Sequence, residues 1–186
     1  KQVGEQVVDL EGLACHFGSA FGNLRRHAQP SSEHFRNLLA EALTQLDSGR
    51  RIWVENESRR IGRVHLPEPF YQRMIACPAL EMKRSVEDRV SHLVGMYGSF
   101  EVDLLREGFE AIQSEVGGPE TREAFESLDG GDFASAARIA LAYYDRTYEH
   151  GLQKRAVDKR HPVDCSGVPL AEAAQRLIAE ADARGF

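Results

Sequence analysis

The sequence predicts an α/β fold, in which a mostly parallel sheet is interrupted by a helical insertion before its last strand. Short apolar runs alternate with helical segments through the first half of the chain, and this order is typical of parallel sheets. The segment 98–151 then has helical spacing throughout. With 186 residues, we expect a single domain, with its α/β core at 1–97 and 152–186 and the helical insertion at 98–151.

The composition is that of an ordinary globular protein, with 42% hydrophobic and 28% charged residues. No apolar run reaches the length of a membrane span and no secretory signal opens the chain, so we expect no membrane partner. Three scattered cysteines without a CxxC pair indicate reduced thiols and a cytoplasmic location. The net charge of −6 argues against a globally basic nucleic-acid binder but permits a local basic patch.

The first strand is expected at Gln6–Leu10, and a loop rich in glycine and small residues follows at 15–22. Such a loop lets backbone amides approach a ligand closely. The alternative is a simple turn in which the histidine is hydrogen-bonded locally. The candidate substrate-binding residues of this region are Asp9, Glu11, His16, Gly18 and Ser19.

A helix is expected after Pro30, because Ser31 or Ser32 can cap it and apolar residues recur at helical spacing from Phe35 to Leu46. It ends near Asp47 and leads into the next strand. Strand, loop, helix and strand together form the βαβ pattern of a parallel sheet.

The strand at Ile52–Val54 ends abruptly in acids, a hydroxyl and two arginines. Ligands bind just outside the carboxyl ends of strands in open α/β sheets. The acids here are suited to orienting a metal or water and the arginines to binding an anion, although a solvated charged turn has much the same pattern. The candidates, to which we assign no metal, are Glu55, Glu57, Ser58, Arg59 and Arg60.

Prolines exclude helix interior at 64–69, and a short helix is expected at 70–75. A third strand follows at 79–82, and Ser85 is expected to cap a helix that runs to Tyr97. Arg89 on that helix is a further candidate for the phosphate site. The alternative is an ion pair with a nearby acid on a wet surface.

In the insertion, we expect helix breaks at Gly117–Pro119 and at Gly130–Asp132. Three tyrosines near its end, at 143, 144 and 148, favour core packing, with base stacking as the alternative if they face outward. A basic run at 154–161 precedes the last strand, at 163–165, and the last helix, which ends near Ala183.

Searches for catalytic motifs are mostly negative. The chain has no HExxH, no Cys/His cluster, no GxSxG elbow and no GxxxxGK followed by Ser or Thr. Because the architecture is otherwise that of a phosphate-binding domain, we expect a strand with such a loop to precede Lys1 in a longer protein.

Several stretches together resemble the tRNA 2-selenouridine synthase family. They are Val8–Ala14, the turn at His16–Gly22, Gln29–Ser31, Trp53–Gly62, Leu66–Pro67, the helix from Arg89 to Tyr97, and Tyr143–Tyr148. The combination of DLEGLA with ESRRIG is specific. Phe17 and Asn56 depart from the residues usual in that family.

The resemblance implies a transferase that geranylates 2-thiouridine at the tRNA wobble position and then replaces the S-geranyl group with selenium. The implied partners are tRNA, geranyl diphosphate and selenophosphate, and no other cofactor is assigned. It also implies that this chain is most of a P-loop NTPase-like domain, with the Walker A loop and a rhodanese domain carrying the reactive cysteine elsewhere in the parent chain. We therefore assign no nucleophile here and expect this chain alone to be inactive.

The resemblance also implies basic residues that contact tRNA phosphates. We assign this role to Arg25, Arg26, Lys154, Arg155, Lys159 and Arg160. Two other functions remain open from the residues alone: a P-loop kinase-like phosphotransferase acting on a small molecule, and a non-catalytic RNA-binding module.

Overall fold

The computed structural model describes residues 4–22, 24, 28–152 and 159–186. The chain divides into two compact units, of which the first combines Lys1–Glu81 with Pro169–Phe186 and the second is Met82–Val168. The first unit contains the two strands whose carboxyl ends carry most of the predicted site residues.

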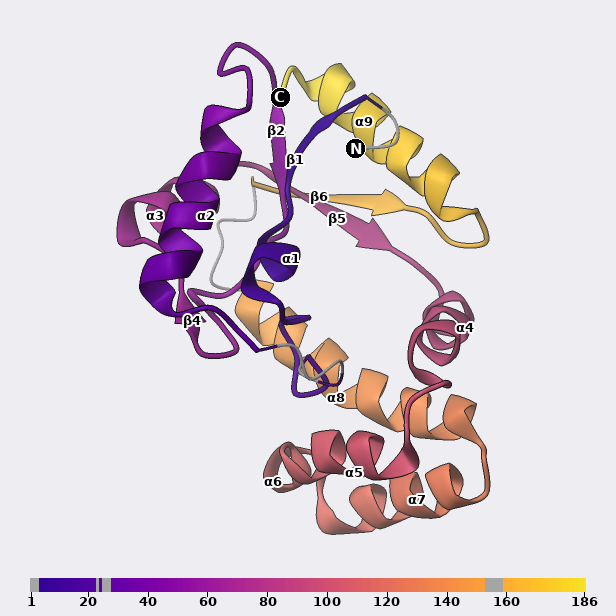
Figure 1. Ribbon diagram of the computed structural model, residues 1–186. Coiled ribbons are helices and arrows are strands. Elements are labelled where there is room, and N and C mark those ends of the chain that lie inside the picture. Colours follow the sequence, from indigo (N-terminus) through magenta and orange to yellow (C-terminus); the bar gives the residue numbers. More distant parts are fainter. Residues whose placement is uncertain (1–3, 23, 25–27, 153–158) are drawn as a thin grey trace. The chain divides into compact units, whose positions relative to one another are not determined.

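Strands β1 (Gln6–Val8) and β2 (Ile52–Val54) are parallel, with Val8 opposite Val54 (Figure 1). The predicted strand at Gln6–Leu10 is therefore correct in place but ends earlier. Helix α1 (Leu10–Ala14) begins at once, because the Asp9 carboxylate accepts a hydrogen bond of 2.7 Å from the Gly12 N–H and caps the helix.

Helix α2 (Ser32–Thr44) packs against α1 and β1 and buries Phe35 and Leu39 completely. The Ser31 hydroxyl accepts a hydrogen bond of 3.1 Å from the His34 N–H, which confirms the predicted cap. The hydrophobic core of this unit is made of Val8, Leu10, Ala14, Phe35, Leu39, Ile61, Val64, Leu66 and Met74.

A hairpin that the sequence did not predict follows the charged segment after β2. Strands β3 (Arg60–Ile61) and β4 (Val64–His65) pair antiparallel, and Gly62 adopts a φ of +57° in the turn. The strands are only two residues long, so they have no periodicity to recognise. Helix α3 (Glu68–Ala76) comes next and starts two residues before the expected position.

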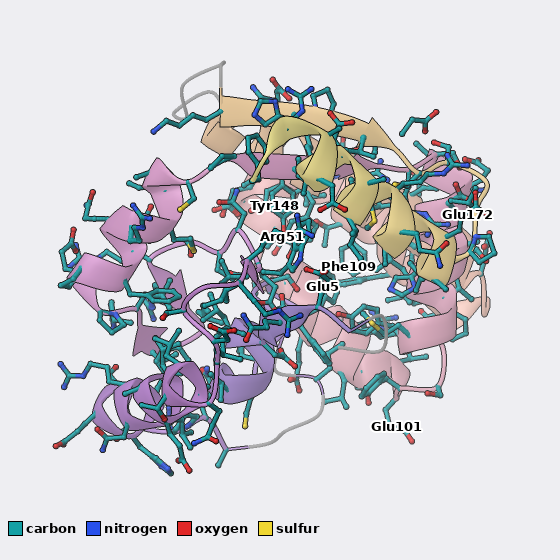
Figure 2. The ribbon with its side chains drawn as sticks, turned by 90° about the horizontal axis from the view of Figure 1, so that it is seen from above. Glu5, Arg51, Glu101, Phe109, Tyr148 and Glu172 are labelled. Atoms are coloured by element: carbon teal, nitrogen blue, oxygen red, sulfur yellow. The ribbon has the colours of Figure 1, made fainter. Side chains whose placement is uncertain are left out.

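The last helix, α9 (Leu170–Arg184), belongs to the first unit and is joined to it through Arg51. The Arg51 guanidinium donates to Asp182 at 2.9 Å and to Glu5 at 3.2 Å. Arg51 and Glu5 are labelled in Figure 2. The guanidinium also lies 5.1 Å from the centre of the Trp53 ring, whose indole N–H donates to Glu5 at 2.7 Å.

The second unit is mainly helical, and α8 packs against both α4 and α7 (Figure 1). The predicted cap at Ser85 and the helix break at Gly117, with a φ of +110°, are both confirmed. The helices are α4 (Val86–Tyr97), α5 (Val102–Glu110), α6 (Gln113–Val116), α7 (Gly118–Asp129) and α8 (Phe133–Leu152).

The remaining strands, β5 (Ala79–Lys83) and β6 (Arg160–Asp164), pair with each other. The α/β class is confirmed, but the residues described here form three two-stranded pairs and not one large, mostly parallel sheet. The early start of α1 accounts for part of the difference, since it takes Leu10 out of the expected first strand. No helix in the described ranges is long and apolar enough to cross a membrane.

Candidate functional site

The carboxyl ends of β1 and β2 bring two acids to the same edge. Asp9 and Glu55 directly follow Val8 and Val54, which are paired in register. The side chains of Asp9 and Glu55 hydrogen-bond to each other, and Glu55 Oε2 also accepts a hydrogen bond of 2.9 Å from the Leu10 N–H. The parallel register thus positions the first pair of acids.

A second pair of acids, Glu11 and Glu57, lies next to the first. Their side chains hydrogen-bond to each other, and the charges of Glu55 and Asp9 also act on Glu11. The structure therefore brings together Asp9, Glu11, Glu55 and Glu57, four residues predicted from two separate stretches. We refer to these four as the carboxyl cluster.

Gly18 closes over the second pair. A Cβ atom at this position would lie 2.7 Å from Glu57 Oε1 and 3.0 Å from Glu11 Oε1, and the φ of +70° also favours glycine. The glycine loop, residues 15–22, thus approaches the carboxyl cluster with its backbone at Gly18. The expected approach of this backbone to a ligand stays a prediction.

Burial and mutual repulsion hold a proton in the carboxyl cluster near neutral pH. Burial, followed by the charges of Glu57 and Glu55, raises the pKa of Glu11 to about 7. Burial is also the largest cause that raises the pKa of Glu55 and of Glu57. Because a carboxyl group must be protonated to donate, and the shared hydrogen bond raises the pKa of Glu11 but lowers that of Glu57, Glu11 is the donor and Glu57 the acceptor.

His16 lies within the glycine loop and bonds locally. Its Nδ1 accepts a hydrogen bond of 3.1 Å from the Gly18 N–H, and burial lowers the pKa of the imidazole, which favours the neutral ring. Glycines at 22 and 62 leave space for this ring, since a Cβ atom at either would lie less than 3 Å from it. A role of His16 in ligand binding stays a prediction.

The two predicted hydroxyl groups stabilise turns. Ser19 Oγ accepts a hydrogen bond of 3.2 Å from the Phe21 N–H, and Ser58 Oγ donates to the Arg60 carbonyl at 2.5 Å. Both residues thus shape the loops that carry the candidate site.

The two predicted arginines lie at the hairpin. Arg59 forms an exposed ion pair of 2.8 Å with Glu68 of α3, and Arg60 Nε donates to the Gly62 carbonyl at 2.6 Å. An exposed pair of this kind contributes little to stability, so Arg59 can exchange Glu68 for an anionic ligand at small cost.

Arg89 belongs to the second unit, where it pairs with Asp145 of α8. Its two terminal nitrogens lie 2.5 and 2.8 Å from the two carboxylate oxygens. This contact is the alternative that the sequence left open, an ion pair with a nearby acid.

Of the predicted tRNA-contacting residues, the structure describes two. Arg160 begins β6, and one of its terminal nitrogens lies 3.9 Å from a carboxylate oxygen of Glu149 in α8. Lys159 directly precedes Arg160. The other four, Arg25, Arg26, Lys154 and Arg155, lie outside the described residues.

Gln29 is a positioning residue that is not among the candidates predicted from the sequence. Its Nε2 donates to the carbonyls of Ala14, at 3.0 Å, and Ile61, at 3.1 Å, and its Oε1 accepts from the Arg63 N–H at 2.9 Å. It thereby ties the end of α1 to the hairpin. Its place in the stretch Gln29–Ser31, one of those that resemble the family, was the only signal.

Within the part of the chain that the structure describes, no group of three or more His, Cys, Asp or Glu residues has the geometry to hold a metal ion. In the carboxyl cluster the acids bond to each other in pairs, so some of their oxygens face one another and not a common centre. Cys15 is exposed in a left-handed conformation, and Cys165 is buried.

These features define an α/β domain with a carboxyl-rich site at the ends of two parallel strands, beneath a glycine loop. Residues 1–129 match the sequence model of the tRNA 2-selenouridine synthase AAA domain. The chain belongs to this family, which confirms the resemblance seen in its motifs. All four acids of the carboxyl cluster lie inside the matched region.

Several curated relatives carry the name tRNA 2-selenouridine synthase. The chain is 46% identical over 93 residues to that of Cupriavidus pinatubonensis, covering 49% of this chain and 25% of the relative. It is 35% identical to that of Hahella chejuensis over 181 residues, covering 81% of this chain and 48% of the relative. It is 31% identical to that of Marinobacter nauticus over 180 residues, covering 80% of this chain and 48% of the relative. The chain thus spans at most about half the length of these relatives, and no solved structure matches it.

Proposed function

We propose that this chain forms part of an enzyme that makes 2-selenouridine in tRNA. The family match over residues 1–129 carries the proposal, and relatives of that name align with about four fifths of the chain. The carboxyl cluster and its glycine loop lie within the match and give the domain a site with unusual electrostatics, as functional sites often have.

The chemistry we propose has two steps. In the first, the sulfur of 2-thiouridine attacks the geranyl carbon of geranyl diphosphate, a C–S bond forms, and diphosphate leaves with the electrons of the C–O bond. In the second, the selenium of selenophosphate attacks C2 of the base, and the C2–S bond breaks so that the S-geranyl group leaves as geranylthiol. Water then cleaves the Se–P bond and releases phosphate, which leaves 2-selenouridine. We place the Walker A loop of a P-loop type sheet, and a rhodanese domain, in the full-length protein outside this chain, which alone is inactive.

The residues described above suit a diphosphate leaving group. Arg59 is exposed on the hairpin and weakly paired, which leaves its guanidinium available for two hydrogen bonds to phosphate oxygens. Glu11 can carry a proton near neutral pH, because its pKa is raised to about 7 by burial and by the charge of Glu57. We assign Arg59 to diphosphate binding and Glu11 to proton transfer.

The decisive experiment supplies the full-length protein with tRNA that carries 2-thiouridine, together with geranyl diphosphate and selenophosphate. Mass spectrometry of the digested tRNA is expected to show the S-geranyl nucleoside without selenophosphate and 2-selenouridine with it. No modified nucleoside from an intact, folded protein would refute the proposal. ATP-dependent phosphorylation of a small molecule, with no tRNA product, would favour the kinase-like alternative.

The role of Arg59 is tested separately by binding of geranyl diphosphate. Arg59→Ala is expected to weaken it by at least about tenfold, since a charge-assisted bidentate contact is lost. Arg176→Ala is the matched control, because Arg176 also forms an exposed pair, with Glu172 of α9 at 2.7 Å. Equal affinity of the Arg59→Ala variant and the wild type would remove Arg59 from the site.

A further inference from the structure

The glycine loop fixes both the place and the tautomer of the His16 ring. The His16 N–H donates to the Glu11 carbonyl at 3.1 Å, and the loop closes where the Phe17 N–H donates to the Gly22 carbonyl at 3.1 Å. Nδ1 of the ring accepts a hydrogen bond of 3.1 Å from the Gly18 N–H. A ring nitrogen that accepts carries no proton, so the proton of the neutral ring is on Nε2.

Two glycines leave space for the ring on either side of Nε2. A Cβ atom at Gly22 would lie 2.4 Å from Cε1 of the ring, and a Cβ atom at Gly62 would lie 2.7 Å from Cδ2. Cε1 and Cδ2 are the two ring atoms bonded to Nε2, so the backbones of the glycine loop and of the hairpin both lie close to this nitrogen. Burial of the ring lowers the pKa of His16 and so favours the neutral form at pH 7.

Nε2 of His16 is a hydrogen-bond donor that no described residue uses. Within residues 4–22, 24, 28–152 and 159–186, the hydrogen bond of the His16 ring is the one at Nδ1. The buried side-chain nitrogens without a partner in these ranges are Nε of Arg84 and Nε of Arg89, so Nε2 of the half-buried His16 is in contact with solvent. A donor that is already held in place binds an acceptor with little ordering cost.

Arg60 contacts the same glycine of the hairpin as the His16 ring does. Its Nε donates to the Gly62 carbonyl at 2.6 Å, which holds the guanidinium at the turn. Arg60 is exposed, and among the described residues its two terminal nitrogens have no hydrogen bond or ion pair. These nitrogens present the parallel N–H groups with which a guanidinium binds phosphate oxygens.

We propose that the Nε2–H of His16 and the guanidinium of Arg60 together bind the phosphoryl oxygens of a substrate at the turn around Gly62. The proposal rests on the proposed function, in which geranyl diphosphate and selenophosphate both carry such oxygens. The cation supplies most of the attraction, and the neutral ring adds a directed hydrogen bond.

The nearest acids oppose an anion less than their number suggests. Gly18 approaches Glu11 and Glu57, and these two share a hydrogen bond in which one carboxyl group holds a proton. This pair therefore carries one negative charge and not two while the proton is held. The alternative to ligand binding is that His16 only braces the loop, through the acceptor Nδ1.

The test uses two substitutions in the full-length protein that separate the two ring nitrogens. Asparagine places an amide oxygen near Nδ1 and has no group at Nε2, whereas glutamine places an amide N–H near Nε2 and has no acceptor at Nδ1. His16→Asn is expected to weaken binding of one phosphoryl substrate by about tenfold, because a hydrogen bond to a charged group is lost. His16→Gln is expected to stay within about threefold of wild type.

Two exposed residues of α2 supply the matched controls. His34→Asn removes a histidine and Arg36→Ala an arginine from the same unit, and both are expected to bind as wild type does. Arg60→Ala is expected to weaken binding of the same substrate by at least about tenfold and to reduce the salt dependence of that binding.

Calorimetric titration with geranyl diphosphate and with selenophosphate, one at a time, identifies the substrate bound here as the one that His16→Asn weakens. Equal affinity of His16→Asn and wild type for both would overturn the inference. A larger loss in His16→Gln than in His16→Asn would also overturn it and leave the ring only its bracing role. If the wild type modifies tRNA while His16→Asn binds both substrates normally, only this inference fails. If the wild type binds neither substrate and modifies no tRNA, the proposed function fails with it.

Discussion

The side chains of Glu11 and Glu57 hydrogen-bond to each other beneath the backbone of Gly18. Two ionised carboxylates in such contact repel, so the pair is stable when one of them holds a proton. The backbone of Gly18 lies so close to both carboxyl groups that a Cβ atom there would be 2.7 Å from Glu57 and 3.0 Å from Glu11, and this arrangement leads to the first two predictions.

Glu11→Gln is expected to increase the free energy of unfolding at pH 8 but not at pH 4. The folded pKa of about 7 lies above the ordinary value of 4.5, so wild-type stability is fully present below about pH 4.5 and falls as the pH rises to 7. The difference at pH 8 is on the order of 1–2 kcal/mol, reduced from the full value of the shift because the group is partly solvated. Urea unfolding at both pH values measures it.

The control for this change is Glu41→Gln, at an exposed position of α2. It should give the same small difference at both pH values. A difference for Glu11→Gln that does not vary with pH would mean that Glu11 holds no proton near neutrality.

Gly18→Ala is expected to destabilise the protein more than Gly131→Ala. Both glycines have a positive φ, of +70° and +75°, so each alanine meets a backbone cost of about 1 kcal/mol. Only at Gly18 would the Cβ also meet carboxylate oxygens, whereas at Gly131 there is no atom within 4 Å. We expect roughly 1 kcal/mol of additional loss at Gly18, measured by chemical denaturation. Equal losses would show that the carboxyl groups move aside freely.

Gln29→Ala is expected to cost about 2–3 kcal/mol of stability, because two backbone carbonyls and one N–H lose a partly buried partner. Gln72→Ala is the matched control, since Gln72 makes one exposed hydrogen bond of 2.7 Å to Glu68 and its loss should cost less than about 0.5 kcal/mol. Thermal or chemical unfolding distinguishes them. A loss at Gln29 no larger than at Gln72 would contradict its positioning role.

Arg89 and Asp145 are expected to show a coupling energy of about 1 kcal/mol in a double-mutant cycle with alanine. The bidentate, partly buried geometry favours this pair over Arg176 and Glu172, an exposed pair on α9 for which we expect at most about 0.5 kcal/mol. Arg89 lowers the pKa of Asp145, so the coupling is present at neutral pH and is lost as the pH falls below about 3.8. Similar couplings in the two pairs would show that Arg89 is not structurally committed to Asp145.

The acids at the carboxyl ends of β1 and β2 were predictable, because an apolar strand followed at once by Asp9 or by Glu55 is visible in the residues. Their pairing was not. Which acid bonds to which depends on the register of two three-residue strands and on the start of α1 at Leu10, and neither has a periodic signal.

Contacts between residues far apart in the chain are the second kind of feature that the sequence could not predict. The sequence around Arg89 is compatible both with a phosphate site and with a surface ion pair. Only the packing of α4 on α8 shows that Asp145 is its partner. Gln29 is similar, because its three partners come from α1 and from a hairpin whose strands are too short to predict. Caps at Ser31 and Ser85 need only local sequence, and both were correct.

The bond between Arg51 and Asp182 has a consequence for the order in which the protein is made. The first unit uses α9, whose residues follow the whole second unit in the chain, and the bonded residues are separated by 131 positions. During synthesis, all of 82–168 is translated before α9 becomes available, roughly 10 seconds after Arg51 at ordinary translation rates. The helical unit can therefore fold first on the ribosome, while β1, β2 and the carboxyl cluster await their last helix.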